Sequence, residues 1–376
     1  MSQDSNPAVY FNCQLCGECC SSWNIPIETH KAEQLLQKAW VQQRLASTRR
    51  ALSPQSAEIY RIPLTDENVC VFLAPDKRCL IEVNEGLALK PHECKRFPFA
   101  TVRMPDGTAR HDTSAACKSI SEKLLLAFQP ILPKTTAHPS QPADDTAIQD
   151  SQAWLEDIGD FPARVQVSAF KTMDWQHYMA IRQTWQRWFE EDNLSAEQAL
   201  AHVQASLNPS GHSVSPQLLK PKPWLNQLVT CCFLRKPYRT LSLLSLLTGG
   251  TYHDSRLFGE PVALRAQAQV FWHPDHERHL KAFLYNLLCR NRLLSAGGSA
   301  ESLIAMAGIA ALLVRWYAKA LASLQGEGQT CQTDVATAIR LVERYYTGHQ
   351  PRFFHFFMGR FKSGVLLKVL AASQTM

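Results

Sequence analysis

The sequence Cys13-Gln-Leu-Cys16-Gly-Glu-Cys19-Cys20 decides how the first part of this chain folds. Two residues separate Cys13 from Cys16, and two more separate Cys16 from Cys19. A two-residue gap allows two thiolates to converge on one metal ion, because the intervening turn directs both sulfurs inward. Gly17 adds the backbone freedom that a loop wrapped around a metal needs. The motif therefore predicts a cysteine-ligated metal centre that holds either zinc or an iron–sulfur cluster.

The remaining ligands are expected from cysteines further along the chain. Eight of the twelve cysteines lie at or before Cys117, which is too uneven for random scatter. Cys70 and Cys79 flank a tight turn at 74–78, and Cys94 lies in a segment that two prolines stiffen. The predicted metal ligands are Cys13, Cys16, Cys19, Cys20, Cys70, Cys79, Cys94 and Cys117.

The number and kind of metal centres stay open at this stage. The spacing of the first three cysteines is that of the run that holds three corners of a 4Fe-4S cluster in bacterial ferredoxins. Cys20 is poorly placed to bind the same iron as Cys19. The thiolates could hold two tetrahedral zinc ions, one cluster and one zinc ion, or one metal with spare redox thiols. The four late cysteines are expected to pack as small apolar side chains: Cys231, Cys232, Cys289 and Cys331.

The composition describes a globular chain with two structured parts. Hydrophobic residues make up 45% and charged residues 19%, which excludes a disordered protein. The net charge of +6 is mild and no basic block occurs, so nucleic acid is not favoured as a partner. Residues 128–160 are rich in Pro, Thr, Ser and Gln, which is typical of a linker or a long loop. We therefore predict a cysteine-rich metal-binding domain over 1–127, the linker over 128–160 and a helical domain over 161–376.

The predicted fold class is mainly α. The cysteine-rich module should be small and irregular, with one helix over 30–51 and a short hairpin of strands at 70–73 and 79–81. After residue 160, apolar residues recur at three- and four-residue steps, and alternation typical of strands is scarce. We therefore expect an all-α helical domain. Its clearest helices are predicted at 178–188, from 195, at 280–289, at 303–324 and at 335–346.

We expect a cytoplasmic protein without a transmembrane segment. The first residues contain neither a basic nor an apolar region of a secretory signal. The longest apolar run, Leu303 to Val314, is short of the ~20 residues that span a bilayer, so it should form a buried core helix. In a reducing compartment the cysteines favour metal binding or redox chemistry over disulfides.

Two further motifs favour structural roles. The histidines of His273-Pro-Asp-His276-Glu-Arg-His279 fit the polar first turn of a helix better than a metal site. The aromatic and basic stretch Arg352–Lys362 is more typical of the core face of a helix than of a nucleic-acid or membrane surface.

The cysteine segments together resemble the YkgJ-type cysteine-cluster family. The similarity covers about the first hundred residues and rests on the segments 13–20, 70–73, 78–81 and 91–99. It implies a domain that chelates zinc or iron, and it implies metal binding but no particular reaction.

A looser similarity is to flagellin lysine N-methylases, which place such a module before a helical region. Trp23–Ile27 and Gly86 fit that layout, whereas Phe99 stands where an Arg is expected. This similarity implies an enzyme, a protein-lysine N-methyltransferase with an iron–sulfur cluster and S-adenosylmethionine. No glycine-rich loop for that cofactor is visible. A zinc-stabilised protein-interaction module is the further alternative, and in each case the helical part should recognise a protein partner or substrate.

Overall fold

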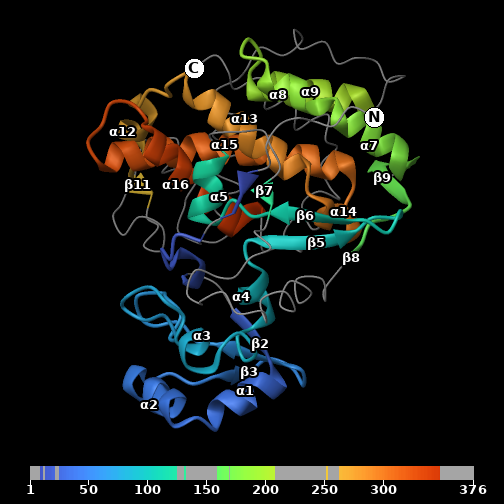
Figure 1. Ribbon diagram of the computed structural model, residues 1–376. Coiled ribbons are helices and arrows are strands. Elements are labelled where there is room, and N and C mark those ends of the chain that lie inside the picture. The colour runs from blue at the N-terminus through green and yellow to red at the C-terminus, as the bar shows by residue number, and fades with distance from the viewer. Residues whose placement is uncertain are drawn as a thin grey trace.

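In the computed structural model the described residues are 9–11, 13–21, 25–124, 131–132, 159–168, 170–207, 251–252 and 262–347. They form a small cysteine-rich part below and a larger helical part above (Figure 1). The predicted linker lies mostly outside the described residues, as do Cys231, Cys232 and the stretch Arg352–Lys362.

The small part is a three-stranded antiparallel sheet covered by two helices. Strands β2 (Ile25–Glu28), β4 (Ile59–Ile62) and β3 (Ser53–Pro54) lie in the order β2-β4-β3. Alternate residues of β2 point inward, so Ile25 and Ile27 are buried. We call the cluster they belong to the small core, and its buried residues are Ile25, Ile27, Ala32, Leu35, Val41, Leu45, Leu52, Ile62, Cys70, Val71, Phe72, Leu73 and Ile81.

The single helix predicted over 30–51 is wrong, because the structure has two. Helix α1 (Thr29–Leu36) ends and α2 (Ala39–Thr48) begins on either side of Lys38, whose backbone is extended. The break turns α2 so that Leu35 and Val41 are both fully buried in the small core. No proline or glycine marks this break in the sequence, because it depends on packing.

The tight turn at 74–78 is confirmed, but both strands predicted around it are wrong, because 70–73 forms only isolated bridges at Cys70 and Leu73. Ala74 N donates to Arg78 O at 2.9 Å, and Leu73 forms an antiparallel bridge with Cys79. Helix α3 (Leu80–Glu85) begins directly afterwards and buries Ile81 in the small core. A short apolar run of this kind does not distinguish strand from helix. Helix α4 (His92–Arg96) follows.

Residues that precede the predicted linker also join the helical part. Strands β5 (Phe99–Arg103) and β6 (Ala109–Thr113) form an antiparallel pair, and β8 (Gly159–Asp160) runs parallel to β5. With α5 (Lys118–Lys123) they contribute Val102, Met104 and Ile120 to the core of the helical part, which we call the large core. The division of the chain into 1–127, 128–160 and 161–376 stays a prediction.

Helices build most of the large core, with α15 among its neighbours at the centre (Figure 1). The predicted helices from 195, at 280–289 and at 303–324 are confirmed, and the last is a core helix as expected. The single helix predicted at 178–188 is wrong, because Thr184 divides it into two helices. The helix predicted at 335–346 ends at Val342 and continues as a π-helical turn. Within the described ranges α15 is long and apolar enough to cross a membrane, but 83% of its apolar window is buried inside the protein. The described helices are α7 (Trp175–Gln183), α8 (Trp185–Glu190), α9 (Ala196–Leu207), α12 (Leu264–Gln269), α13 (His276–Leu288), α14 (Asn291–Ser295), α15 (Ala300–Leu324), α16 (Gln332–Val342) and the π-helical turn η3 (Glu343–Thr347).

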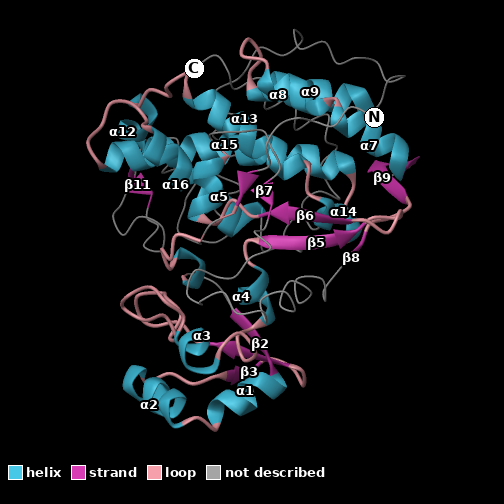
Figure 2. Ribbon diagram, viewed as in Figure 1, coloured by secondary structure: helices cyan, strands magenta, loops and turns pink. Residues whose placement is uncertain are grey.

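The expectation of an all-α second part is wrong, although the described chain is mainly helical. Strands β9 (Arg164–Ser168) and β10 (Lys171–Asp174) form a hairpin, and β11 (Thr251–Tyr252) pairs with β12 (Val262–Ala263) (Figure 2). The sequence did not predict this hairpin, because Val165 and Val167 are its only alternating residues that are apolar and point into the core. A third short pair joins β1 (Val9–Tyr10) to β7 (Ile131–Leu132).

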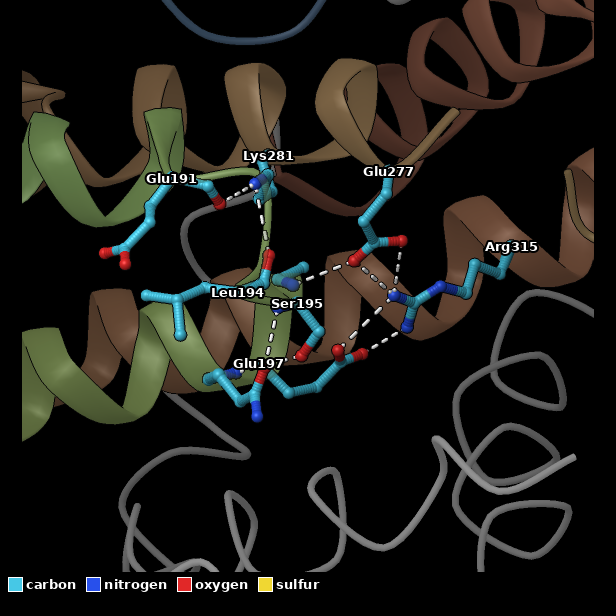
Figure 3. Close-up of polar contacts among 9 residues, drawn as sticks. Glu191, Leu194, Ser195, Glu197, Glu277, Lys281 and Arg315 are labelled. Carbon is cyan, nitrogen blue, oxygen red and sulfur yellow. Dashed lines mark hydrogen bonds and ion pairs between the residues drawn. The ribbon is translucent and has the colours of Figure 1, made fainter. Parts of the chain in front are cut away.

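A polar network fixes the start of α9 to α13 and α15 (Figure 3). The Arg315 guanidinium donates to the carboxylates of Glu197 and Glu277, and Glu277 in turn accepts from Ala196 N at 2.8 Å. Lys281 is 2% exposed, and its Nζ donates to the main-chain oxygens of Glu191 and Leu194. The positive charges of Arg315 and Lys281 therefore balance the negative charges of Glu197 and Glu277 in this part of the large core.

The three histidines around the start of α13 serve structural contacts, as predicted. The Nε2 of His276 lies 3.0 Å from Thr330 O, whereas the Nε2 of His279 lies 3.1 Å from Ser121 O on α5. His279 is 2% exposed, and its burial lowers its pKa to about 4. Its imidazole is therefore neutral at pH 7 and donates its one N–H to that carbonyl.

We expect His279 to make the protein acid-sensitive between about pH 6.5 and 4. Over this range the unfolded state binds a proton at an ordinary histidine, whereas the folded state does not, so stability falls with falling pH. The difference between about 6.5 and about 4 corresponds to about 3 kcal/mol of unfolding free energy. Urea unfolding at pH 7.5 and 4.5 should show that His279→Gln loses this part of the pH dependence. The exposed-site variant His30→Gln should keep it, and equal slopes for wild type and His279→Gln would contradict the prediction.

Candidate metal centre

The loop 13–20 needs backbone conformations that few side chains allow. Leu15 and Gly17 both have positive φ, at 50° and 73°, and the short 3-10 turn η1 (Glu18–Cys20) follows. A Cβ on Gly17 would lie 3.2 Å from Lys77 Cδ and 3.3 Å from Leu73 Cδ2. Glycine is therefore required at this position both by its φ and by the approach of the 73–77 turn.

The four other segments that carry predicted ligands approach this loop from two sides. Cys20, Cys70, Cys79 and Cys94 pack on the small core, and Cys117 packs on the large core. Cys70 N donates to Cys20 O at 2.6 Å, so the loop is joined directly to the small core. Cys79 and Cys117 stand immediately before α3 and α5. The cysteines outside 13–19 thus divide between the small and the large core.

The same kind of hydrogen bond orients two of the eight sulfurs. Each accepts a backbone N–H from the residue two positions later, and in Cys13 and Cys70 the donor lies 3.5 and 3.4 Å from Sγ. Such N–H donors favour the thiolate and orient it, as the outer partners of metal ligands do. The sulfur–donor pairs are Cys13 with Leu15 and Cys70 with Phe72.

Cys19 is the thiol best prepared to lose its proton. Its sulfur lies 3.9 Å from that of Cys20, whose hydrogen bond lowers the pKa of Cys19 to about 7. The positive charges of Lys90 and Arg344 act in the same direction. Cys19 is also exposed, so a metal ion can reach it from solvent.

The remaining thiols are held in the protonated form by their surroundings. Burial raises the pKa of Cys70 and of Cys117 to about 12, and it also raises the pKa of Cys94 well above its ordinary value. Lys90 partly offsets this effect at Cys79 and Cys94, and its ammonium pairs with Glu82 at 2.6 Å. A metal ion bound here would have to displace these protons.

The donor set fits zinc or an iron–sulfur cluster in its chemistry. Across the described ranges, no three Cys, His, Asp or Glu side chains stand together as a formed metal site requires. The sulfurs of Cys19 and Cys20 lie 3.9 Å apart and share a thiol hydrogen bond. The assignment of the eight cysteines as ligands stays a prediction.

Reasoning from sequence missed the charged residues around the loop. Lys90, Arg340 and Arg344 approach it from outside the cysteine motifs, and no spacing rule connects them with Cys19. Of the late cysteines, Cys289 lies beside Tyr285 at the end of α13, as expected for a packing residue. Cys331 is exposed at the start of α16, so its predicted burial is wrong.

One family model matches the chain, over residues 12–118, and its description reads "CxxCxxCC: Putative zinc- or iron-chelating domain". The matched segment contains all eight predicted ligands and ends immediately after Cys117. Neither the curated proteins nor the solved structures gave a match.

Proposed function

Since residues 12–118 match the family model of a zinc- or iron-chelating domain, we propose that this protein binds metal through eight thiolates held between its two cores. The observation that carries the proposal is that thiols from distant segments lie near one another. Cys94 interacts electrostatically with Cys70 and Cys79, and Cys117 with Cys19 and Cys16. Cysteines that merely fill a core need not gather in this way, whereas the ligands of one metal ion must.

The eight thiols divide into two sets of four by their position in the fold. The first set packs on the small core and consists of Cys20, Cys70, Cys79 and Cys94. The second set lies in the loop and before α5, and consists of Cys13, Cys16, Cys19 and Cys117. Four thiolates are the number that one structural zinc ion or one 4Fe-4S cluster takes. We assign one metal ion or cluster to each set.

The neighbours of each thiol support this division. Cys117 interacts electrostatically with Cys16 and Cys19, and Cys94 with Cys70 and Cys79. Cys19 adjoins both sets, since its sulfur lies beside that of Cys20. Zinc in these sites would cross-link the segments, and an iron–sulfur cluster would in addition supply electron transfer.

Metal analysis and a visible absorption scan after anaerobic purification test the proposal. Wild type should contain two zinc ions, or iron and sulfide with the absorption of a cluster. Cys70→Ser/Cys79→Ser and Cys16→Ser/Cys117→Ser should each lose about half of the metal, and the exposed control Cys331→Ser should lose none.

Two results would go against these assignments. A folded wild-type protein without either metal, whose thiols at 13–20 are all freely alkylated, would refute metal binding. If each of the two double variants loses all of its metal, the eight thiolates hold one shared centre and the assignment of two sites is wrong.

Protein-lysine methylation with an iron–sulfur cluster is the finer function that the sequence suggests. It requires S-adenosylmethionine and a protein substrate, which the helical part would recognise. Incubation of the iron-loaded protein with S-adenosylmethionine and a flagellin-like protein should then produce a methyl mass shift on lysine. A colourless protein with two zinc ions and no mass shift would favour the zinc-stabilised interaction module. The cytoplasmic location stays a prediction.

A further inference from the structure

Two arginines of the helical part hold the cysteine loop from outside the metal-binding domain. The Arg340 Nε on α16 lies 3.0 Å from the Glu18 carboxylate. The Arg344 Nη2 in η3 donates to the main-chain oxygen of Glu18 at 3.1 Å, and its Nη1 lies 3.4 Å from Ser21 Oγ. More than 300 residues of sequence separate the partners, so these contacts exist only when the two parts are assembled.

These contacts lie in a largely dry place. The side chains of Arg340 and Arg344 are 12% and 11% exposed, against 33% for Glu18. Ion pairs in such surroundings are screened less by solvent and salt than surface pairs. Arg344 binds a carbonyl inside the η1 turn, where Ser21 Oγ also donates to Glu18 O at 2.8 Å. The arginine therefore fixes the backbone that presents Cys19 and Cys20.

Arg340 connects both segments of the second set of thiols. Besides Glu18, it reaches Ser121 Oγ at 3.4 Å on α5, the helix that begins after Cys117. Ser121 O in turn accepts from His279 on α13. One side chain thus sets the position of the loop relative to the segment that carries Cys117.

We propose that Arg340 and Arg344 are positioning residues of the metal centre, and that through them metal occupancy is coupled to the order of α16 and η3. This inference rests on the proposed metal binding. Docked arginines hold the loop in the form that binds metal, so their loss should speed metal release. Because coupling between two equilibria is reciprocal, metal removal should loosen the helical segment that carries them.

The first experiment measures metal release to a coloured chelator from the full-length, metal-loaded protein. Partners outside the ligand shell typically change metal affinity 10–100-fold, so Arg340→Gln and Arg344→Gln should each release metal about 10-fold faster than wild type. Arg278→Gln, an exposed arginine on α13, removes the same charge and should release at the wild-type rate. Glu18→Ala removes the carboxylate that both arginines approach, so it should also release metal faster than wild type.

The second experiment measures hydrogen exchange of residues 332–347 in the wild-type protein with and without metal. Exchange should rise when metal is removed, and it should rise in Arg344→Gln even with metal bound. Wild-type release rates in both arginine variants, with near-UV circular dichroism showing them folded, would overturn the coupling while leaving metal binding intact. Hydrogen exchange of residues 332–347 that is the same with and without metal would also overturn the coupling. A wild-type protein that holds no metal would refute the proposed function itself, and this inference with it.

Discussion

Removing metal from the wild-type protein is expected to unfold the small core while the large core stays folded. The small core is built from only a short sheet, the short helices α1–α3 and thirteen buried residues. A core of this size supplies only a few kcal/mol by itself, and the cysteines described here are free thiols that form no disulfides. Ligation by Cys20, Cys70 and Cys79 would join the loop, the 70–73 segment and α3.

The size of this effect follows from what metal binding contributes to folding. Structural zinc contributes ~10–16 kcal/mol in zinc-finger peptides at pH 7, which is comparable to the ~5–15 kcal/mol stability of a whole domain. Hydrogen exchange after chelation should show loss of protection over residues 25–96 and retained protection in α13 and α15. Return of zinc or iron should restore it. If protection from hydrogen exchange over residues 25–96 is the same before and after chelation, the small core is stable without metal and the prediction is wrong.

Arg315→Met is expected to destabilise the large core by about 3–5 kcal/mol. Removal of one partner from a buried ion pair leaves the remaining charges without compensation, and such losses are typically of this size. Here two carboxylates, Glu197 and Glu277, would lose the same guanidinium (Figure 3). Glu197 is only 4% exposed, so water cannot take over the contact. Urea unfolding followed by far-UV circular dichroism measures the loss.

A matched variant separates charge from packing at this site. In Arg315→Met/Glu197→Gln/Glu277→Gln no uncompensated carboxylate remains, so most of the lost stability should return. Lys281 keeps its two main-chain acceptors in both variants. A triple variant that is as unstable as Arg315→Met would show that the Arg315 side chain acts by packing on Trp272, whose ring it covers at 5.7 Å.

Helices with a continuous apolar face could be predicted from sequence, because that signal is local. The run Leu303 to Val314 alone specifies a buried helix, and α15 contains it. The break at Lys38 and the hairpin β9–β10 could not be predicted in this way. Each is stabilised by burial against elements far away in sequence: Leu35 and Val41 in the small core, and Val165 and Val167 in the large core.

The sequence by itself determined the cysteine loop and its chemistry. Spacing and Gly17 fix a turn that presents several thiols together, because the turn needs positive φ at defined positions. Only the tertiary structure decided how the distant thiols divide between the two cores, and which charges surround them. Lys90, Arg340 and Arg344 reach the loop through long-range packing, and electrostatic contacts of this kind leave no pattern in the residues next to the cysteines.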